Sequence, residues 1–159
     1  MARYIIATLL YLLVGGCDGP GPPEDADTQT VVIHGQRFDL ELAVDQAARV
    51  QGLSDRTLIP IKGGMLFVFA RQQPYLQFVM RQCLVPIDII YLDAGGRIVS
   101  MSRMQVEAYD TPEHELRRYS SVYPAQFAIE LAGGTLDTLD LRQGQRIELP
   151  LADLKRSAR

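Results

Sequence analysis

The sequence predicts a mainly β fold, and two observations carry this prediction. Residues 64–93 hold the densest apolar stretch outside the N-terminal segment, in three short runs rich in aromatic and β-branched side chains. Short apolar runs bounded by glycine or proline are typical of buried strands rather than helices. The second observation is the turn chemistry of residues 93–96 (Asp-Ala-Gly-Gly), which predicts a hairpin and a returning strand at residues 97–101.

The other elements follow from periodicity and from cap or turn residues. Asp45 is a typical N-cap for a short helix, and Gly52 stands where such a helix ends. His34 falls in a hairpin turn, and Thr135 is expected to cap a second short helix. The expected strands are residues 30–33, 37–44, 65–69, 75–80, 87–92, 97–101, 126–131 and 146–149; the expected helices are 46–51 and 136–139. Residues 105–123 are a long polar connection with one helical turn, and residues from 151 onward read as a fraying tail.

One carboxylate lies inside an apolar strand. Asp88 is flanked by isoleucines, and an unpaired buried carboxylate is costly to desolvate. We therefore expect a cationic partner, and Arg49, Arg56 and Arg81 are the candidates within sequence reach. Two interpretations stay open, a structural ion pair that fixes the strand register and a carboxylate that binds a ligand.

A polar interruption separates two of the apolar runs. Arg81, Gln82 and Cys83 stand between them, and loops on a rigid scaffold often present functional groups. Because arginine pairs bidentately with carboxylates, a small anionic ligand such as a sugar acid fits these residue types. The candidate ligand-binding residues are Arg49, Arg56, Arg81, Gln82 and Asp88.

These motifs resemble those of a known family. Residues 64–69 (GMLFVF), 78–91 (FVMRQCLVPIDIIY) and 127–131 (FAIEL) are similar to the pattern of the prokaryotic DUF192 family, also called UPF0127. The likeness spans most of residues 30–150. It implies a single compact, jelly-roll-like β-sandwich or barrel, and it implies no activity because the family has none assigned.

The sequence departs from the family pattern in three places. Val79 stands where the family usually has tryptophan, and Ser54 stands where it has methionine. Residues 81–83 (Arg-Gln-Cys) replace a usual Lys-Asn-Thr. If that loop performs chemistry in the family, this member has altered or lost it.

The N-terminal residues predict an envelope lipoprotein. A basic start (Arg3) and an apolar segment too short to span a bilayer comfortably lead into Leu-Val-Gly-Gly-Cys, which resembles a bacterial lipobox. Residues 1–16 are then a signal peptide and Cys17 is lipidated, with an uncleaved anchor as the alternative. Asp18 resembles the signal that retains lipoproteins at the periplasmic face of the inner membrane rather than the outer membrane.

The remaining organisation is a tether, one domain and a tail. Residues 17–28 are rich in proline, glycine and acids and cannot bury a core. Residues 29–151 form the β domain and 152–159 the tail. Of 16 basic and 19 acidic residues, Arg3 and four tether acids lie outside the domain, which leaves 15 of each. Equal numbers of basic and acidic residues do not predict a nucleic-acid-binding surface.

The cysteine and histidine content predicts no metal centre and no cofactor. With Cys17 acylated, Cys83 is the one remaining thiol, so an intramolecular disulfide is excluded, and one cysteine with two histidines cannot build a zinc framework. His114 is expected to be a solvated loop residue. Because Cys83 stands at a family threonine and no G-x-S-x-G motif is present, nucleophilic catalysis is disfavoured.

The sequence therefore favours a binding module for a small polar or anionic ligand or for an envelope protein partner. One alternative is a hydrolase-like envelope enzyme that uses the region of Arg81 and Asp88. Another is a copper-handling protein, since thioethers and thiols are ligands that Cu(I) prefers. Its candidate ligands are Met65, Met80, Met101, Met104 and Cys83.

Overall fold

A computed structural model describes residues 27–159 of the chain. The predicted signal peptide, the lipidation site Cys17, the sorting residue Asp18 and nearly all of the tether lie outside the described residues. Within residues 27–159, no helix is long and apolar enough to cross a membrane.

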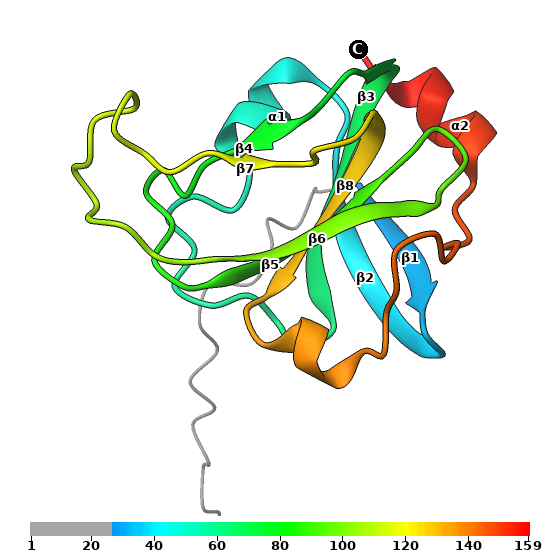
Figure 1. The fold of residues 1–159 in the computed structure, drawn as a ribbon, viewed down its shortest axis with the longest axis horizontal. Helices are drawn as coiled ribbons and strands as arrows, with labels where there is room; N and C mark the ends of the chain where they lie inside the picture. Colours follow the sequence, from blue (N-terminus) through cyan, green and yellow to red (C-terminus); the bar gives the residue numbers. More distant parts are fainter. Residues whose placement is uncertain (1–26) are drawn as a thin grey trace, which may run out of the picture.

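The described chain is built on a six-stranded sheet with the order β1-β2-β3-β8-β5-β6 (Figure 1). The pair β2–β3 is parallel and every other pair in the sheet is antiparallel. A small second sheet pairs β4 with β7. The strands are β1 (Thr28–Ile33), β2 (Gln36–Ala43), β3 (Gly63–Gln73), β4 (Gln77–Phe78), β5 (Ile87–Leu92), β6 (Ile98–Met104), β7 (Tyr119–Ser120) and β8 (Ala125–Ala132).

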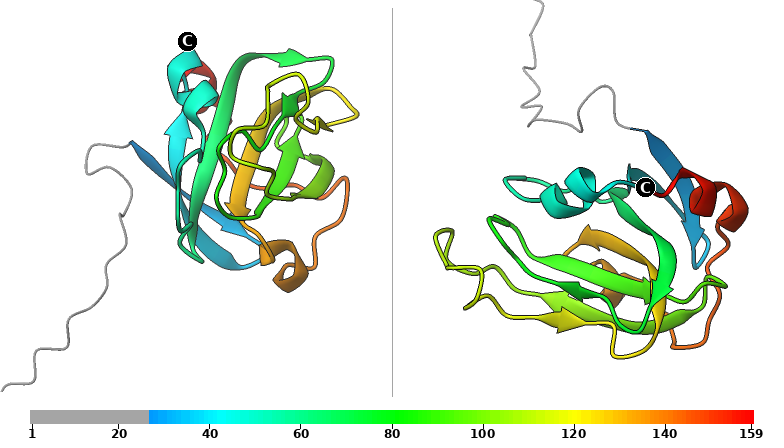
Figure 2. Two further views of the ribbon diagram at one scale, coloured as in Figure 1. Left: turned by 90° about the vertical axis from the view of Figure 1, so that its left-hand side faces the viewer. Right: turned by 90° about the horizontal axis from the view of Figure 1, so that it is seen from above.

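Three short helices lie around the sheet: α1 (Gln46–Gln51), the 3-10 helix η1 (Thr135–Thr138) and α2 (Leu151–Ser157), as Figure 2 shows in two further views. The predicted caps of α1 are confirmed, because the Asp45 side chain accepts a hydrogen bond from the Ala48 amide at 2.9 Å. Gly52 ends the helix with a φ of 50°, a conformation that glycine adopts without steric cost. Thr135 is the first residue of η1 rather than its cap, and Gly134 precedes it.

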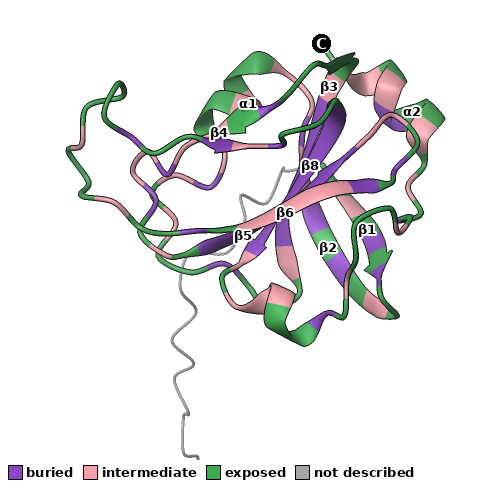
Figure 3. Cartoon of the chain, viewed as in Figure 1, coloured by how far each residue is buried: buried purple, intermediate pink, exposed green. Residues whose placement is uncertain are grey.

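The sheet carries a hydrophobic core on each face. Alternate side chains of a strand point to opposite faces, so Leu66 and Val68 of β3 enter one core while Met65 and Phe67 enter the other. The buried residues gather on β3, β8 and β5 (Figure 3). The mainly β, sandwich-like fold predicted from the sequence is thus confirmed.

Several predicted elements need correction. Residues 146–149 do not form a strand, since only a single bridge joins Arg97 to Arg146. The run at 75–80 yields only the two-residue strand β4. The expected fraying tail is wrong as well: residues 151–157 form α2, and Leu154 is buried in the first core. Leu151 and Leu154 are three residues apart, which places both on one helix face and explains the docking.

Candidate functional site

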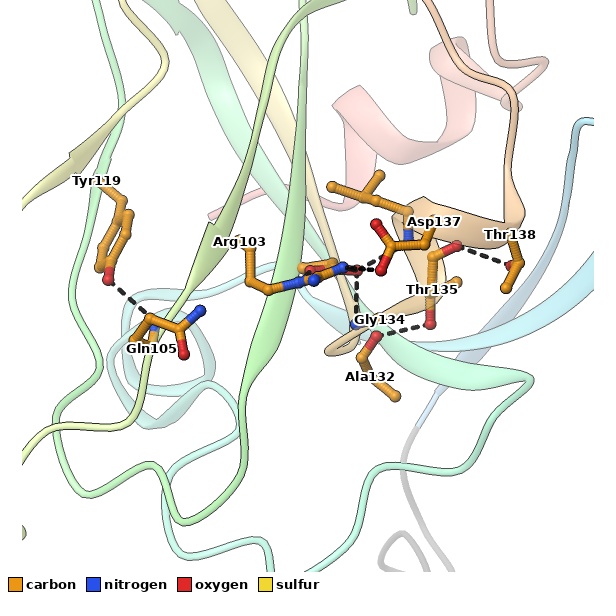
Figure 4. Close-up of polar contacts among 10 residues, drawn as sticks. Arg103, Gln105, Tyr119, Ala132, Gly134, Thr135, Asp137 and Thr138 are labelled. Carbon is orange, nitrogen blue, oxygen red and sulfur yellow. Dashed lines mark hydrogen bonds and ion pairs between the residues drawn. The ribbon is translucent and has the colours of Figure 1, made fainter.

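Asp88 is a buried structural carboxylate. Its side chain is fully buried, and it accepts a hydrogen bond at 2.9 Å from Nε of Arg103 on β6. The backbone amides of Gly134 and Leu136 donate to its Oδ2 at 2.9 and 2.8 Å. Figure 4 shows Arg103 beside Gly134 and Asp137, which is a second acidic partner of the guanidinium at 2.8 Å.

The prediction that Arg49, Arg56 or Arg81 would form an ion pair with Asp88 is therefore wrong. Asp88 and Arg103 are directly opposite each other in the β5–β6 ladder, so the hairpin register selects the partner. The surrounding donors satisfy both oxygens of the carboxylate, which matches the structural interpretation of the two left open.

Two other candidate residues, Arg56 and Gln82, form contacts that do not involve Asp88. Arg56 forms an ion pair with Glu41 at 2.8 Å. Gln82 has a φ of 52° and its carbonyl accepts a hydrogen bond from the Asp55 amide, so it shapes the loop after β4.

Arg49 and Arg81, the remaining two candidates, line a common pocket of about 240 Å³ between α1, β3, β4 and residues 105–118. We call it the Glu130 pocket. Phe67, Phe78 and Leu53 supply its apolar wall. Its polar and charged lining residues are Gln46, Arg49, Gln51, Ser54, Gln77, Arg81, Glu113, Arg118 and Glu130.

Glu130 is the deep polar group of this pocket. It lies on β8, flanked in the ladders by Met65 of β3 and Ile89 of β5, and it is only 4% exposed. Its carboxyl has no hydrogen-bond partner in the described part of the chain. Among the described residues, every completely buried side-chain oxygen or nitrogen does have a partner, so the Glu130 carboxyl oxygens are not completely buried. The carboxyl oxygens therefore retain access to the pocket that Glu130 lines.

This burial changes the acid–base chemistry of the site. Desolvation raises the pKa of Glu130 to about 8, so the carboxyl is largely protonated at neutral pH. Burial, and after it the charge of Glu130, raises the pKa of the Cys83 thiol to about 12. Cys83 accordingly remains a thiol, which disfavours it as a nucleophile.

The rim of the pocket is cationic. Arg81 Nη1 lies 3.3 Å from Glu113 Oε2, and Arg118 Nη1 lies 3.4 Å from Glu113 Oε1. Two guanidinium groups therefore share one carboxylate. Arg81 Nη2 also donates to the Val50 carbonyl at 2.5 Å, which fixes the side chain against α1.

Arg49 plays a different part in the same wall. Its guanidinium donates to the carbonyls of Val44, Val68 and Arg159 at 2.8, 3.0 and 2.8 Å. It also lies over the Phe69 ring, 5.2 Å from the centroid. These contacts occupy most of its donors, so Arg49 holds α1, β3 and the end of the chain together.

Asp88 and the Glu130 pocket lie on opposite faces of the sheet. Asp88 shares its side of β5 with Ile90 and Leu92 of the first core, whereas Phe67 and Cys83 of the pocket belong to the second. Arg81 and Asp88 therefore do not form one joint site.

The potential metal ligands are also separated. Within the described residues, no three or more His, Cys, Asp or Glu side chains gather where they could hold a metal ion. Three methionines, Met65, Met80 and Met104, share the second core with Cys83, whereas Met101 packs on the first. His114 is 81% exposed and lies 3.4 Å from Glu115.

Sequence reasoning missed Glu130 and Arg118 as site residues. The signal for Glu130 was present, because it is a charged residue inside an apolar strand, as Asp88 is. Choosing between these two acids required the registers of β5 and β8 with their neighbours, which place only Glu130 at a pocket. Arg118 comes from an irregular connection that carries no periodic pattern.

Fold and site together define a small mainly β, sandwich-like domain with a carboxyl-based pocket. The profile of DUF192, described as an uncharacterized ACR family, matches residues 29–149, and the chain belongs to this family. A comparison with curated proteins found no match.

Two solved structures share the fold. One is a Sinorhizobium meliloti protein described as a candidate transcription regulator, with a TM-score of 0.63 at 24% identity over 75% of this chain and 89% of that one. The other is a Novosphingobium aromaticivorans protein of unknown function, with a TM-score of 0.62 at 22% identity over 82% of this chain and 100% of that one. At these identities the likeness shows the fold alone.

Asp88→Ala should lower the free energy of unfolding by roughly 2–4 kcal/mol, because it leaves two partly buried amides without their acceptor and removes one of the two acidic partners of Arg103. The matched control is Asp140→Ala, which breaks an exposed pair with Arg142 and should change stability by less than about 0.5 kcal/mol. Urea unfolding monitored by circular dichroism measures both. Equal midpoints for the two variants would contradict the structural role of Asp88.

The stability of the protein should fall as pH rises, and Glu130→Gln should remove this fall. The pKa of Glu130 is about 8 in the folded state, above its unfolded value of about 4.3. The folded state thus holds the proton more tightly, and the favourable contribution is complete below about pH 4.3 and lost as pH rises through about 8.

The measurement is urea unfolding of wild type and Glu130→Gln from pH 5 to pH 9. The wild type should lose on the order of a few kcal/mol relative to the variant, at about 1.4 kcal/mol for each unit of pKa difference. Glu148→Gln, at an exposed carboxylate, should follow the wild-type curve. Parallel curves for wild type and Glu130→Gln would overturn the assignment of a protonated buried carboxyl.

Proposed function

We propose that this protein is a lipid-anchored periplasmic binding module that takes a small polar, anionic ligand in the Glu130 pocket. One observation carries the proposal: Glu130, a residue that is only 4% exposed, lines a pocket with a carboxyl that has no hydrogen-bond partner in the described chain. Leaving a buried polar group unpaired costs free energy, and a ligand that pairs with it recovers that cost.

The charge of the rim supports an anion. Arg81 and Arg118 face a single carboxylate, Glu113, so the rim retains an excess positive charge. Arginine presents several donors in a planar fork that matches carboxylate geometry. Both side chains are more than a third exposed, which leaves donors free for a ligand that enters from solvent.

The N-terminal sequence supports the anchor. The lipobox-like Leu-Val-Gly-Gly-Cys17 and the acidic, proline-rich segment after it fit a lipidated cysteine followed by a tether. Asp18 supports placement at the periplasmic face of the inner membrane. A lipid anchor on a tether would hold the domain near the membrane without a basic surface patch.

The alternative functions have less support. A hydrolase that used Arg81 together with Asp88 has no common site, since these residues lie on opposite faces of the sheet. Of the candidate copper ligands, Met65, Met80, Met104 and Cys83 share the second core and Met101 packs on the first. The methionines of the second core are buried among apolar side chains, as core-filling thioethers usually are, and burial keeps Cys83 in the thiol form rather than the thiolate that binds metals. Binding of an envelope protein is the alternative to be tested if no small molecule binds.

A thermal-shift screen of the full chain in detergent against sugar acids, sugars and small carboxylates should give a saturable hit. A ligand at 100 times its Kd stabilises by about 2.7 kcal/mol. Glu130→Leu and Arg81→Ala should each abolish or weaken the shift, and Arg142→Ala, at an exposed ion pair away from the pocket, should not. A shift that survives both pocket variants would place binding elsewhere, and no shift with any compound would disprove small-ligand binding of these classes.

Expression of the full chain in a Gram-negative host with labelled palmitate should give a labelled, membrane-associated protein. Cys17→Ala should lose the label and the membrane association, because no thiol remains at the lipobox. Cys83→Ala is the matched control, since it removes the other cysteine of the chain and should keep the label. An unlabelled wild type, or equal labelling of Cys17→Ala, would contradict the lipoprotein assignment.

A further inference from the structure

We propose that the ligand of the Glu130 pocket is a small hydroxy monocarboxylate whose hydroxyl lies at the end remote from its carboxylate. The carboxylate would lie between Arg81 and Arg118, and the hydroxyl would pair with Glu130. This inference rests on the proposed function and narrows it to one class of ligand.

The arrangement of polar groups gives the two ends of the ligand. Glu130 lies on the central strand β8 and is almost completely buried, whereas the side chains of Arg81 and Arg118 are 38% and 47% exposed. The acidic group therefore lies at the base of the pocket and the cationic groups lie at its mouth. A ligand that satisfies both must carry unlike polar groups at opposite ends.

The mouth favours a single negative charge. Two guanidinium groups and one carboxylate leave one positive charge uncompensated in this cluster. A monocarboxylate matches that excess, and two oxygens in one plane match the donor fork of arginine. A dianion such as a phosphate monoester would bring one charge more than the cluster neutralises.

The bottom of the pocket, where Glu130 lies, favours a neutral group on the ligand. Because burial keeps Glu130 largely protonated at pH 7, its carboxyl can both donate to and accept from a hydroxyl. An ammonium group would require Glu130 to ionise among Phe67, Phe78 and Leu53, where desolvation of the charge is costly. Cys83 also faces this region and remains a neutral thiol.

The middle of the pocket selects size and shape. Phe67 and Phe78 contact each other edge to face with ring centroids 4.9 Å apart, and both line the pocket. Such a wall suits an apolar or aromatic ligand body. The volume of about 240 Å³ falls below the range of about 300–1,000 Å³ for drug-sized ligands, so the ligand has few atoms.

Isothermal titration calorimetry at pH 7 on the full chain in detergent tests this class with three matched probes. 4-Hydroxybenzoate carries both groups, benzoate lacks the hydroxyl, and 4-(aminomethyl)benzoate replaces it with an ammonium. We expect 4-hydroxybenzoate to bind at least tenfold more tightly than benzoate, which corresponds to about 1.4 kcal/mol, and more tightly than the ammonium compound.

Variants separate the two ends of the site. Glu130→Leu should reduce the preference for the hydroxyl to within about twofold, whereas Glu130→Gln should retain it because an amide also donates and accepts. Arg118→Ala should weaken 4-hydroxybenzoate and benzoate alike by about fivefold or more. Arg142→Ala, at an exposed ion pair away from the pocket, should leave all three affinities unchanged.

Three results would overturn the proposal. Equal binding of benzoate and 4-hydroxybenzoate would show that the hydroxyl has no partner. Tightest binding of the ammonium probe, lost in Glu130→Gln, would show an ion pair at the base and a zwitterionic ligand class. If none of the probes binds, the hydroxy-acid class is wrong, while a hit in the wider screen that depends on Glu130 would leave the binding function intact.

Discussion

The fold depends on β8, which lies between β3 and β5 in the middle of the six-stranded sheet. Ladders on both sides satisfy its backbone, and its side chains supply both cores, with Phe127, Ile129 and Leu131 in one and Ala128 in the other. A strand buried on both faces has no solvent-exposed side on which a charge can be hydrated. The carboxyl of Glu130, which has no hydrogen-bond partner among the described residues, is therefore exceptional within β8, and it lines a pocket.

Two acids inside apolar strands meet opposite environments in this protein. Asp88 is opposite Arg103 in the hairpin and also accepts from the amides of Gly134 and Leu136, so its charge is compensated by the fold itself. Glu130 faces hydrophobic neighbours and a pocket, and burial raises its pKa to about 8. An acidic residue inside an apolar strand is thus a structural residue in one case and a candidate binding residue in the other. The difference arises because the strand register and the neighbouring elements determine whether the carboxyl has a partner.

Local patterns predicted much of the fold. The N-cap Asp45, the helix end at Gly52 and the glycine-containing hairpin turns act through neighbouring residues, so the sequence alone located α1 and the hairpins. The docking of α2 was missed because the helix packs against β3 and a core built largely from strands far away in the chain. The predicted partners of Asp88, which were Arg49, Arg56 and Arg81, were wrong because the register of the β5–β6 hairpin places Arg103 opposite Asp88, and the turn residues alone did not fix that register.

The candidate site was predicted only in part. Arg49 and Arg81 were recognised, but Arg49 mainly holds α1, β3 and the chain end together, and Arg118 and Glu130 emerged only with the pocket. Family membership supplies the fold and no activity, so the chemistry of the pocket must come from its own geometry. That geometry combines a cationic mouth, an aromatic wall and a buried carboxyl.

The most direct test of the central claim is an NMR titration of the Glu130 side-chain carboxyl in carbon-13-labelled protein, with Glu130→Gln to assign the signal. The account predicts a titration midpoint near pH 8, set by desolvation at the base of the pocket. A midpoint near the ordinary glutamate value of about 4.3 would mean that the carboxyl is hydrated or paired, and it would contradict the account.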